Sequence, residues 1–106
     1  MIVAVSIEDK INEFDNNKIQ QDKKYFNLFK IYNIENGEII STEIVRHSFG
    51  LQANLLVERN KINVIIYGNV PFGSQEWWSN HNVQVFSGID GDADEVVRLF
   101  LKGKLS

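Results

Sequence analysis

The run Met1–Ile7 (MIVAVSI) sets the architecture, because it is an almost unbroken series of apolar and β-branched side chains. Such a run is typical of a strand that is buried on both faces at the centre of a sheet. A second short run, Asn63–Tyr67, has the same character. The two runs predict inner strands around which the rest of the chain is arranged.

Three further segments have the composition of strands. Tyr25–Ile34 and Glu38–Val45 alternate apolar with polar residues, and Asn36-Gly37 between them supplies the positive φ angles of a tight hairpin. We expect these two strands to be antiparallel neighbours, with Glu38–Val45 at an edge of the sheet. Val83–Phe86 is predicted as the fifth strand.

Three segments have helical periodicity instead. Apolar residues recur at helical spacing over Phe49–Asn60, and again over Ser74–His81. The third helix begins at a capping box formed by Asp92 and Glu95 and ends at Gly103. We therefore expect three helices.

The predicted order of elements is β-β-β-α-β-α-β-α, a hairpin followed by alternating units. An α/β fold with helices packed on a mixed sheet is the economical solution for this order. We expect a five-stranded sheet of order 3-2-1-4-5, with strand 2 antiparallel to the others and three flanking helices. This is the arrangement of the ribonuclease-H-like motif.

Composition narrows the classes of protein and partner. The 106 residues, with one Pro, seven Gly and 43% hydrophobic residues, suit a single domain over residues 1–106. A net charge of −3 argues against a nucleic-acid partner held by phosphate neutralisation. The longest apolar stretches are far too short to span a bilayer, and no signal-type segment opens the chain, so we expect a cytoplasmic protein without a membrane partner.

The expected strand order also predicts where a ligand would bind. In open α/β sheets, ligands bind at the carboxyl ends of the parallel strands, where the strand order reverses. Here that point lies between the first and fourth strands, so the loops of interest are residues 8–24, 46–50, 68–72 and 87–91. The first of these is polar and rich in both charges, which predicts a long mobile loop.

In the order and spacing of its segments, the chain resembles the dinitrogenase iron–molybdenum cofactor biosynthesis family. The resemblance covers essentially the whole chain except residues 8–24. It rests on the order and spacing of the following segments: Ile2–Val5, Phe29–Ile40, Arg46–Gly50, Leu55–Glu58, Val64–Asn69, Val83–Gly88 and Leu101–Leu105.

The resemblance implies a small accessory or carrier protein that binds an iron–sulfur-containing metal cluster or a cofactor precursor and catalyses no reaction. It also implies, as partners, the cluster and a protein that donates or accepts it. Two departures stand out. Many members have a His-Phe-Gly turn after the first strand, where this chain has no His, and some have a Cys near the first helix, where it has His47 and Ser48.

His47 is the candidate metal ligand. It lies in the predicted turn between the third strand and the first helix, from which an imidazole could reach the switch point and coordinate iron. The alternative is a structural or solvated histidine. With no Cys in the chain, thiolate ligation of a cluster is excluded. His81, at the far end of the second predicted helix, is expected on the opposite edge of the sheet.

Four residues are candidates for holding an anionic cluster or cofactor. Gly68 and Asn69 follow the fourth strand, where exposed amide groups could bind an anion. The alternative is a turn in which both residues merely accept unusual φ angles. Ser48 and Gly50 belong to the same turn as His47 and complete the candidate set.

Three functions compete at this point. Cluster carriage follows from the resemblance and from His47, and an iron–sulfur or iron–molybdenum type cluster would be the cofactor. A protein-interaction module that keeps the fold but has lost the cluster follows from the missing His and Cys. A ribonuclease-H-like nuclease is disfavoured, because it needs several carboxylates around divalent metals and the fourth strand ends in Gly68-Asn69.

Overall fold

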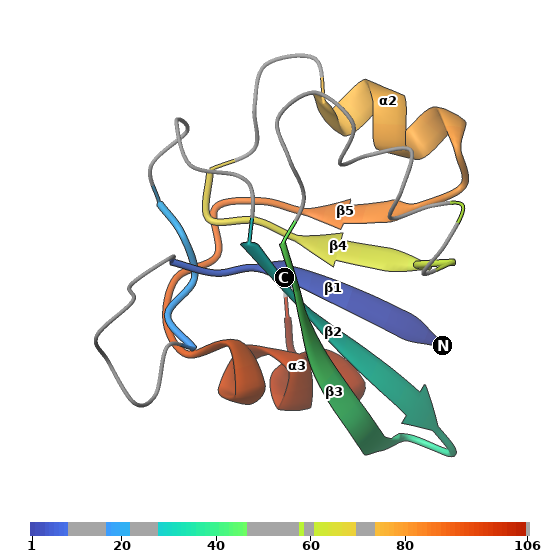
Figure 1. Cartoon of the computed structure of the whole chain (residues 1–106), viewed down its shortest axis with the longest axis vertical. Helices are drawn as coiled ribbons and strands as arrows, with labels where there is room; N and C mark the ends of the chain where they lie inside the picture. Colours follow the sequence, from blue (N-terminus) through green and yellow to red (C-terminus); the bar gives the residue numbers. More distant parts are fainter. Residues whose placement is uncertain (9–16, 22–27, 47–57, 59–60, 70–73, 106) are drawn as a thin grey trace.

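The strands form one sheet with helices on both faces (Figure 1). The computed structural model describes residues 1–8, 17–21, 28–46, 58, 61–69 and 74–105. The strands are β1 (Ile2–Ser6), β2 (Leu28–Glu35), β3 (Glu38–Arg46), β4 (Val64–Ile66) and β5 (Gln84–Phe86), and the helices are α2 (Ser74–Asn80) and α3 (Ala93–Leu101).

The sheet order is β3-β2-β1-β4-β5, as the sequence predicted. β2 runs antiparallel to both β1 and β3, whereas β4 runs parallel to β1 and β5. β1 is the middle strand of this order. Its residues Val3, Ala4 and Val5 are fully buried, because both faces of the sheet are covered here. The α/β class and the mixed topology are therefore confirmed.

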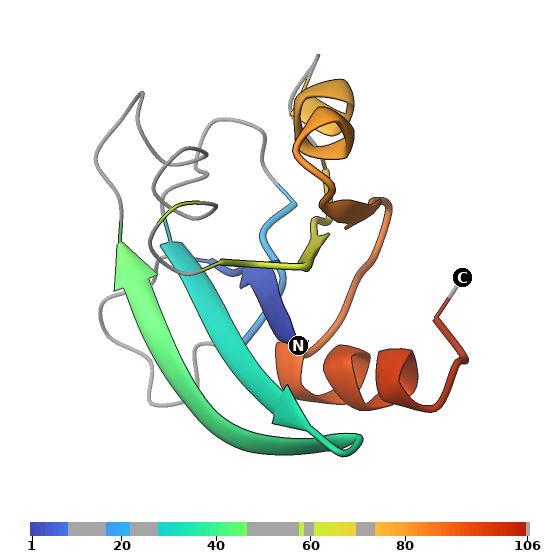
Figure 2. The same ribbon diagram turned by 90° about the vertical axis from the view of Figure 1, so that its right-hand side faces the viewer.

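Side chains that alternate across the strands form two separate cores. The α3-side core contains Val3, Val5, Ile7, Ile19, Leu28, Tyr32, Ile34, Val64, Ile66, Ile89, Ala93, Val96 and Val97. The α2-side core contains Ala4, Phe29, Ile31, Ile62, Ile65, Tyr67, Trp78 and Val83. Figure 2 shows α2 and α3 on opposite sides of the sheet, with the β2–β3 hairpin curving beneath α3.

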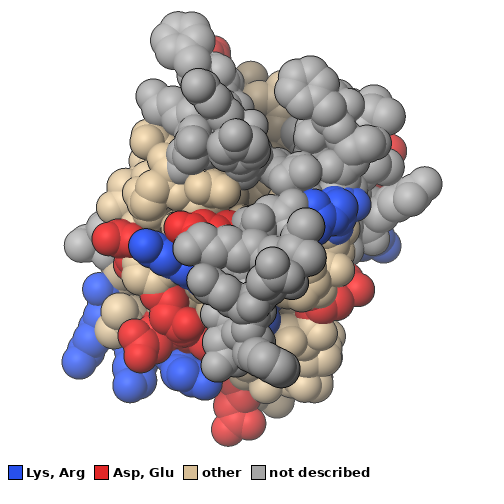
Figure 3. All heavy atoms as spheres, turned by 60° about the vertical axis from the view of Figure 1, so that its left-hand side comes forward, with Lys and Arg blue, Asp and Glu red and all other residues tan. Residues whose placement is uncertain are grey.

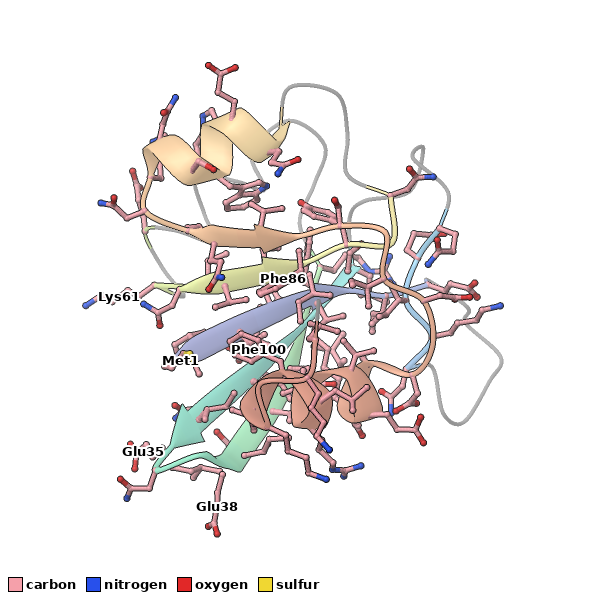
Figure 4. All side chains as sticks on the ribbon, turned by 180° about the vertical axis from the view of Figure 1, so that it is seen from behind. Met1, Glu35, Glu38, Lys61, Phe86 and Phe100 are labelled. Carbon is pink, nitrogen blue, oxygen red and sulfur yellow. The ribbon has the colours of Figure 1, made fainter. Side chains whose placement is uncertain are left out.

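Two features anchor α3. Its N-cap is Asp92, whose carboxylate accepts a hydrogen bond from the Glu95 amide at 3.1 Å, as the capping box predicted. On the apolar face of the helix, Phe100 packs edge-to-face against Phe86 of β5, with ring centroids 5.6 Å apart (Figure 4). The helix is therefore oriented by both its cap and its buried stripe.

The β2–β3 turn also agrees with its sequence. Asn36 and Gly37 have φ angles of 54° and 76°, the left-handed values that a two-residue hairpin requires. A register shift between Asn33 and Ile34 then introduces a bulge into β3. This bulge increases the local twist and accompanies the curvature of the hairpin.

The prediction of a mobile loop over residues 8–24 is wrong for residues 17–21, while residues 9–16 and 22–24 lie outside the described residues. Residues 8–24 were expected to form a mobile loop, yet within them Ile19 is fully buried and Gln20 is 8% exposed. Ile19 bridges to Ile7 and Lys18 bridges to Asp92, so residues 17–21, hereafter the strap, are tied to both β1 and the α3 cap. The buried Ile19 side chain and the backbone hydrogen bonds of Ile19 and Gln20 together dock this otherwise polar segment.

The first predicted helix, over Phe49–Asn60, lies outside the described residues apart from Glu58. The described part of the chain contains the other two predicted helices, α2 and α3. Neither of these helices is long and apolar enough to cross a membrane.

Candidate functional site

The carboxyl ends of β1, β4 and β5 meet at one edge of the sheet, as expected for neighbouring parallel strands. Beyond the strands, the chain is held by backbone hydrogen bonds. The Tyr67 amide donates to the Phe86 carbonyl at 2.8 Å, the Gly88 amide donates to Gly68 at 3.0 Å, and the Ile89 amide donates to Tyr67 at 3.2 Å. The turn after β4 is therefore fixed to the turn after β5.

The strap packs against this edge. The Gln20 amide donates to the Ser6 carbonyl at 3.0 Å. The Gln21 side-chain amide donates to the Ile89 carbonyl at 2.9 Å, and the Asn69 side chain donates to the Gln21 carbonyl at 3.0 Å. The strap thus joins the ends of all three parallel strands.

Gly68 is required by this packing. A Cβ atom at residue 68 would lie 2.5 Å from the carbonyl oxygen of Gln20 and closer still to the side-chain amide of Gln21. The Gln21 side chain is flexible, but the Gln20 carbonyl is part of the backbone, so a larger residue could fit only if the strap moved. Gly68 therefore allows the close approach of two chain segments.

Ser6, the last residue of β1, is fully buried at the same edge. Its hydroxyl has no hydrogen-bond partner in the structure that the described residues form. Buried hydroxyl groups are nearly always satisfied, so among the described residues this one is an exception. By the alternation along β1, Ser6 shares the face of Ala4, which belongs to the α2-side core.

The structure brings together only some of the residues predicted for the site. Gly68 and Asn69 lie beside Ser6 and the strap at the carboxyl ends of β1 and β4, and we call Ser6, Gly68 and Asn69 the carboxyl-end site. His47, Ser48 and Gly50 lie outside the described residues, so their roles stay predictions.

The donor atoms of the described residues do not form a metal cage. Among them, no group of three or more His, Cys, Asp or Glu side chains is placed to hold a metal ion. His81 is exposed and stacks on Trp77, with ring centroids 3.9 Å apart, while its Nδ1 lies 2.8 Å from the Trp77 carbonyl oxygen. It follows α2 and precedes the amino end of β5, so it is far from the carboxyl-end site in the topology.

A second polar cluster was missed by reading the sequence. The Asp94 carboxylate of α3 accepts hydrogen bonds from Lys30 Nζ at 2.8 Å, from the Tyr32 hydroxyl at 2.5 Å and from the Asn17 side chain at 3.1 Å. Lys30 also donates to the Asn17 side-chain oxygen at 2.9 Å. One signal in the sequence points to it. In the alternation of β2, Lys30 lies on the same inward face as Leu28 and Tyr32, and a lysine on a buried face needs a charged partner.

The environment shifts two pKa values in this cluster. Burial acts to raise the pKa of Asp94, but hydrogen bonds from Lys30 and Tyr32 outweigh it and hold the pKa below its ordinary value. Burial, together with the hydrogen bond to Asp94, raises the pKa of Tyr32 far above its ordinary value. The carboxylate therefore stays ionised and the phenol neutral across the physiological range.

This cluster borders a hollow of about 490 Å³ between α3 and the β2–β3 hairpin. The hollow is lined by Lys30, Tyr32, Gly37, Glu38, Ile39, Thr42, Asp94, Arg98 and Leu101. Two of these residues are basic, Lys30 and Arg98, and two are acidic, Glu38 and Asp94. The hollow therefore has no charge preference that would favour an anionic or a cationic ligand. On the face drawn in Figure 3, acidic and basic side chains of the described residues are likewise intermixed.

Several known proteins are similar to this chain in sequence or in fold. No protein-family model matches the chain. The uncharacterized protein MJ0580 of Methanocaldococcus jannaschii is 30% identical over 98 residues, which cover 86% of this chain and 83% of the relative.

Two solved structures share the fold over the whole chain. The crystal structure of PH0822 superposes with a TM-score of 0.83 at 19% identity and is covered to 93% of its length. The solution structure of MJ0327 from Methanococcus jannaschii, described as a putative dinitrogenase, superposes with a TM-score of 0.74 at 25% identity and is covered to 91%. The resemblance to the dinitrogenase iron–molybdenum cofactor biosynthesis family is thereby confirmed.

Proposed function

The chain belongs to one protein family with MJ0580 of Methanocaldococcus jannaschii, and on that premise we propose that it is a small accessory or carrier protein for a metal cluster. The cargo would be an iron–sulfur-containing cluster or a cofactor precursor, bound at the carboxyl ends of β1 and β4 and handed on without a catalysed reaction. Support comes from the fold that it shares with a protein described as a putative dinitrogenase.

The observation that carries the proposal is the buried hydroxyl of Ser6 at the switch point of the sheet, which has no hydrogen-bond partner among the described residues. β1 is the strand at which the order reverses, with β2 on one side and β4 on the other. A polar group that finds no partner in the described part of the chain favours a ligand at this point over a purely structural edge. Asn69, on the neighbouring turn, adds an amide at the same edge.

The donor set defines how such a cargo would be held. With no Cys in the chain, thiolates cannot ligate the cluster. His47 would supply the imidazole, and Ser48, Gly50, Gly68 and Asn69 would contribute hydrogen bonds to the anionic periphery of the cluster. Such a site would bind weakly compared with a thiolate cage, which suits a carrier that must release its cargo.

The test is cluster uptake by protein purified without oxygen. We expect the chain to bind iron–sulfur material, measured by metal analysis and by visible absorption, and we expect His47→Ala to bind clearly less. His81→Ala is the matched control, because His81 is the second histidine of the chain and is stacked on Trp77 away from the carboxyl-end site. Equal uptake by the His47→Ala and His81→Ala variants would contradict a ligand role for His47.

Ser6→Ala tests the hydroxyl separately. Because Ser6 Oγ makes no hydrogen bond to the described residues, its removal should leave the folded chain at least as stable while reducing cluster uptake. Unchanged uptake by Ser6→Ala would remove the observation on which the site assignment rests.

The alternative function is a protein-interaction module that keeps the fold without the cluster. It is favoured by the absence of Cys from the chain and of His from residues 8–24. If the wild-type chain takes up no iron under anaerobic reconstitution, yet metal-free chain forms a stable complex with another protein, the alternative replaces cluster carriage.

A further inference from the structure

The strap continues the sheet beyond the point where β4 ends (Figure 1). The Glu8 amide donates to the Lys18 carbonyl at 2.8 Å, and the Gln20 amide donates to the Ser6 carbonyl at 3.0 Å. On its other side, β1 still pairs with β2 as far as Ser6. The end of β1 and the strap therefore form a short antiparallel ladder at the switch point of the sheet.

The two faces of this ladder differ in polarity. Ile7 opposes Ile19 in the ladder, and both side chains belong to the α3-side core. Directly opposed residues share a face and neighbours along a strand alternate, so the residues before and after this pair lie on the other face. These residues are Ser6, Glu8, Lys18 and Gln20, hereafter the polar ladder. The face that carries the apolar α2-side core thus becomes polar at the carboxyl end of β1.

Three members of the polar ladder are withdrawn from solvent. Ser6 is fully buried, Gln20 is buried, and the Glu8 side chain is 16% exposed. Lys18 Nζ lies 3.9 Å from Glu8 Oε1, which is longer than a hydrogen bond, and the Lys18 side chain is 61% exposed. A cross-strand pair on a solvated face would expose both partners equally. The carboxylate instead lies inward and the ammonium group lies at the surface.

Glu8 also differs from the described carboxylates in the turn between β5 and α3. Asp90 is exposed, and its Oδ1 accepts a hydrogen bond from the Gly91 amide at 2.8 Å within the turn itself. Asp92 is the N-cap of α3. Both of these carboxylates serve local structure. Glu8 instead shares its face with Ser6, whose hydroxyl has no hydrogen-bond partner among the described residues.

We propose that Glu8 supplies a carboxylate ligand to the iron of the cargo, with the Ser6 hydroxyl forming a hydrogen bond beside it. Because the chain has no Cys, iron must be held by oxygen and nitrogen donors, and carboxylate with imidazole is a common donor set for ferrous iron in proteins. The inference rests on the proposed function, since it adds an oxygen ligand to the site for which His47 is the candidate nitrogen ligand.

In this arrangement Lys18 competes with the metal. Its ammonium group lies near the Glu8 carboxylate and would repel a bound cation, but its exposed side chain is able to move into solvent. Removing the charge of Lys18 should therefore strengthen metal binding, whereas removing the charge of Glu8 should weaken it. A variant with a damaged fold cannot reproduce the gain expected at Lys18.

The first test measures the dissociation constant of ferrous iron alone, by calorimetry of the full chain without oxygen. Glu8→Gln preserves the size of the side chain and should raise the constant by about tenfold or more. Asp90→Asn, which removes a carboxylate after β5, is the matched control and should leave the constant unchanged. Circular dichroism of each variant shows that it is folded.

The second test uses the opposite sign. Lys18→Gln should lower the dissociation constant of ferrous iron by about threefold or more, because a positive charge near the metal is lost. Lys104→Gln makes the same change of net charge at an exposed position after α3 and should have no effect. A Glu8→Gln variant that binds iron as tightly as Asp90→Asn, or a Lys18→Gln variant that binds no more tightly than Lys104→Gln, would overturn the proposal.

Uptake of iron–sulfur material separates this inference from the proposed function. If wild type and Glu8→Gln take up equal amounts while His47→Ala takes up less, the chain is a carrier in which Glu8 is not a ligand. If the wild-type chain takes up neither ferrous iron nor iron–sulfur material, both proposals fail. Loss of uptake in Glu8→Gln, with full uptake in Asp90→Asn, is the result that we expect.

Discussion

Lys30 in β2 and Asp94 in α3 form an ion pair of 2.8 Å across 64 positions of the chain. The Asn17 side chain contacts both partners, so the pair also holds the strap. Three segments that are distant in sequence are thereby joined at one largely buried point. The stability of the fold should accordingly be sensitive to each member of this cluster.

Replacement of Lys30 by Met should lower the free energy of unfolding by about 1–3 kcal/mol, because Asp94 loses a charge-assisted hydrogen bond while remaining partly buried. Urea unfolding monitored by circular dichroism measures the change. Lys104→Met, at an exposed position, is the control and should have a negligible effect. A Lys30→Met variant as stable as Lys104→Met would show that the ion pair contributes nothing.

The cluster should also make stability depend on acid pH. The pKa of Asp94 is lower in the folded chain than in the unfolded chain, where the pKa of an Asp is about 3.9. The unfolded state therefore binds the proton first, so the stabilisation is complete above that pH and is lost as the pH falls toward the folded pKa. In Asp94→Asn, urea unfolding measured at a series of acid pH values should show a shallower decline than in the wild type.

Gly68→Ala should destabilise the chain by about 1–3 kcal/mol, because the new methyl group would overlap the Gln20 carbonyl. Combining it with Gln21→Ala removes the flexible neighbour and leaves the backbone overlap. The double variant should therefore recover little of the loss in thermal unfolding. Full recovery would mean that the Gln21 side chain, and not the strap backbone, requires a glycine at residue 68.

The strap should be protected from hydrogen exchange. The amides of Ile19 and Gln20 donate to the carbonyls of Gly91 and Ser6, both at 3.0 Å, and Ile19 is fully buried. Amide exchange followed by NMR should therefore be slow for both residues, as in a packed element and not as in a solvated loop. Fast exchange at Ile19 would restore the original expectation of a mobile segment.

Much of the fold could be predicted because its signals are local. Asn36-Gly37 adopts the positive φ angles that its residue types favour, and Asp92 caps α3 through the Glu95 amide. The apolar run of β1 indicated burial on both faces, which the central position of the strand confirms. From these elements and the rules of chain connection, the strand order followed.

The candidate site was less predictable. Gly68 and Asn69 were identified from their place after β4, but their contacts with the strap were not foreseen, because they depend on residues about 48 positions earlier in the chain. The Lys30–Asp94 pair escaped notice for the same reason. Each partner is an ordinary charged residue in its own segment, and only the packing of α3 on β2 gives the pair its environment.

Short-range patterns were enough to specify the β-hairpin, the two described helices and the central strand, because backbone preference and side-chain periodicity act within a few residues. Folding in three dimensions was needed to bury Ile19, to press the strap against Gly68 and to bury the Ser6 hydroxyl where none of the described residues bonds to it. These features arise from contacts between remote segments, whose free energies depend on shape and burial and cannot be read from neighbouring residues.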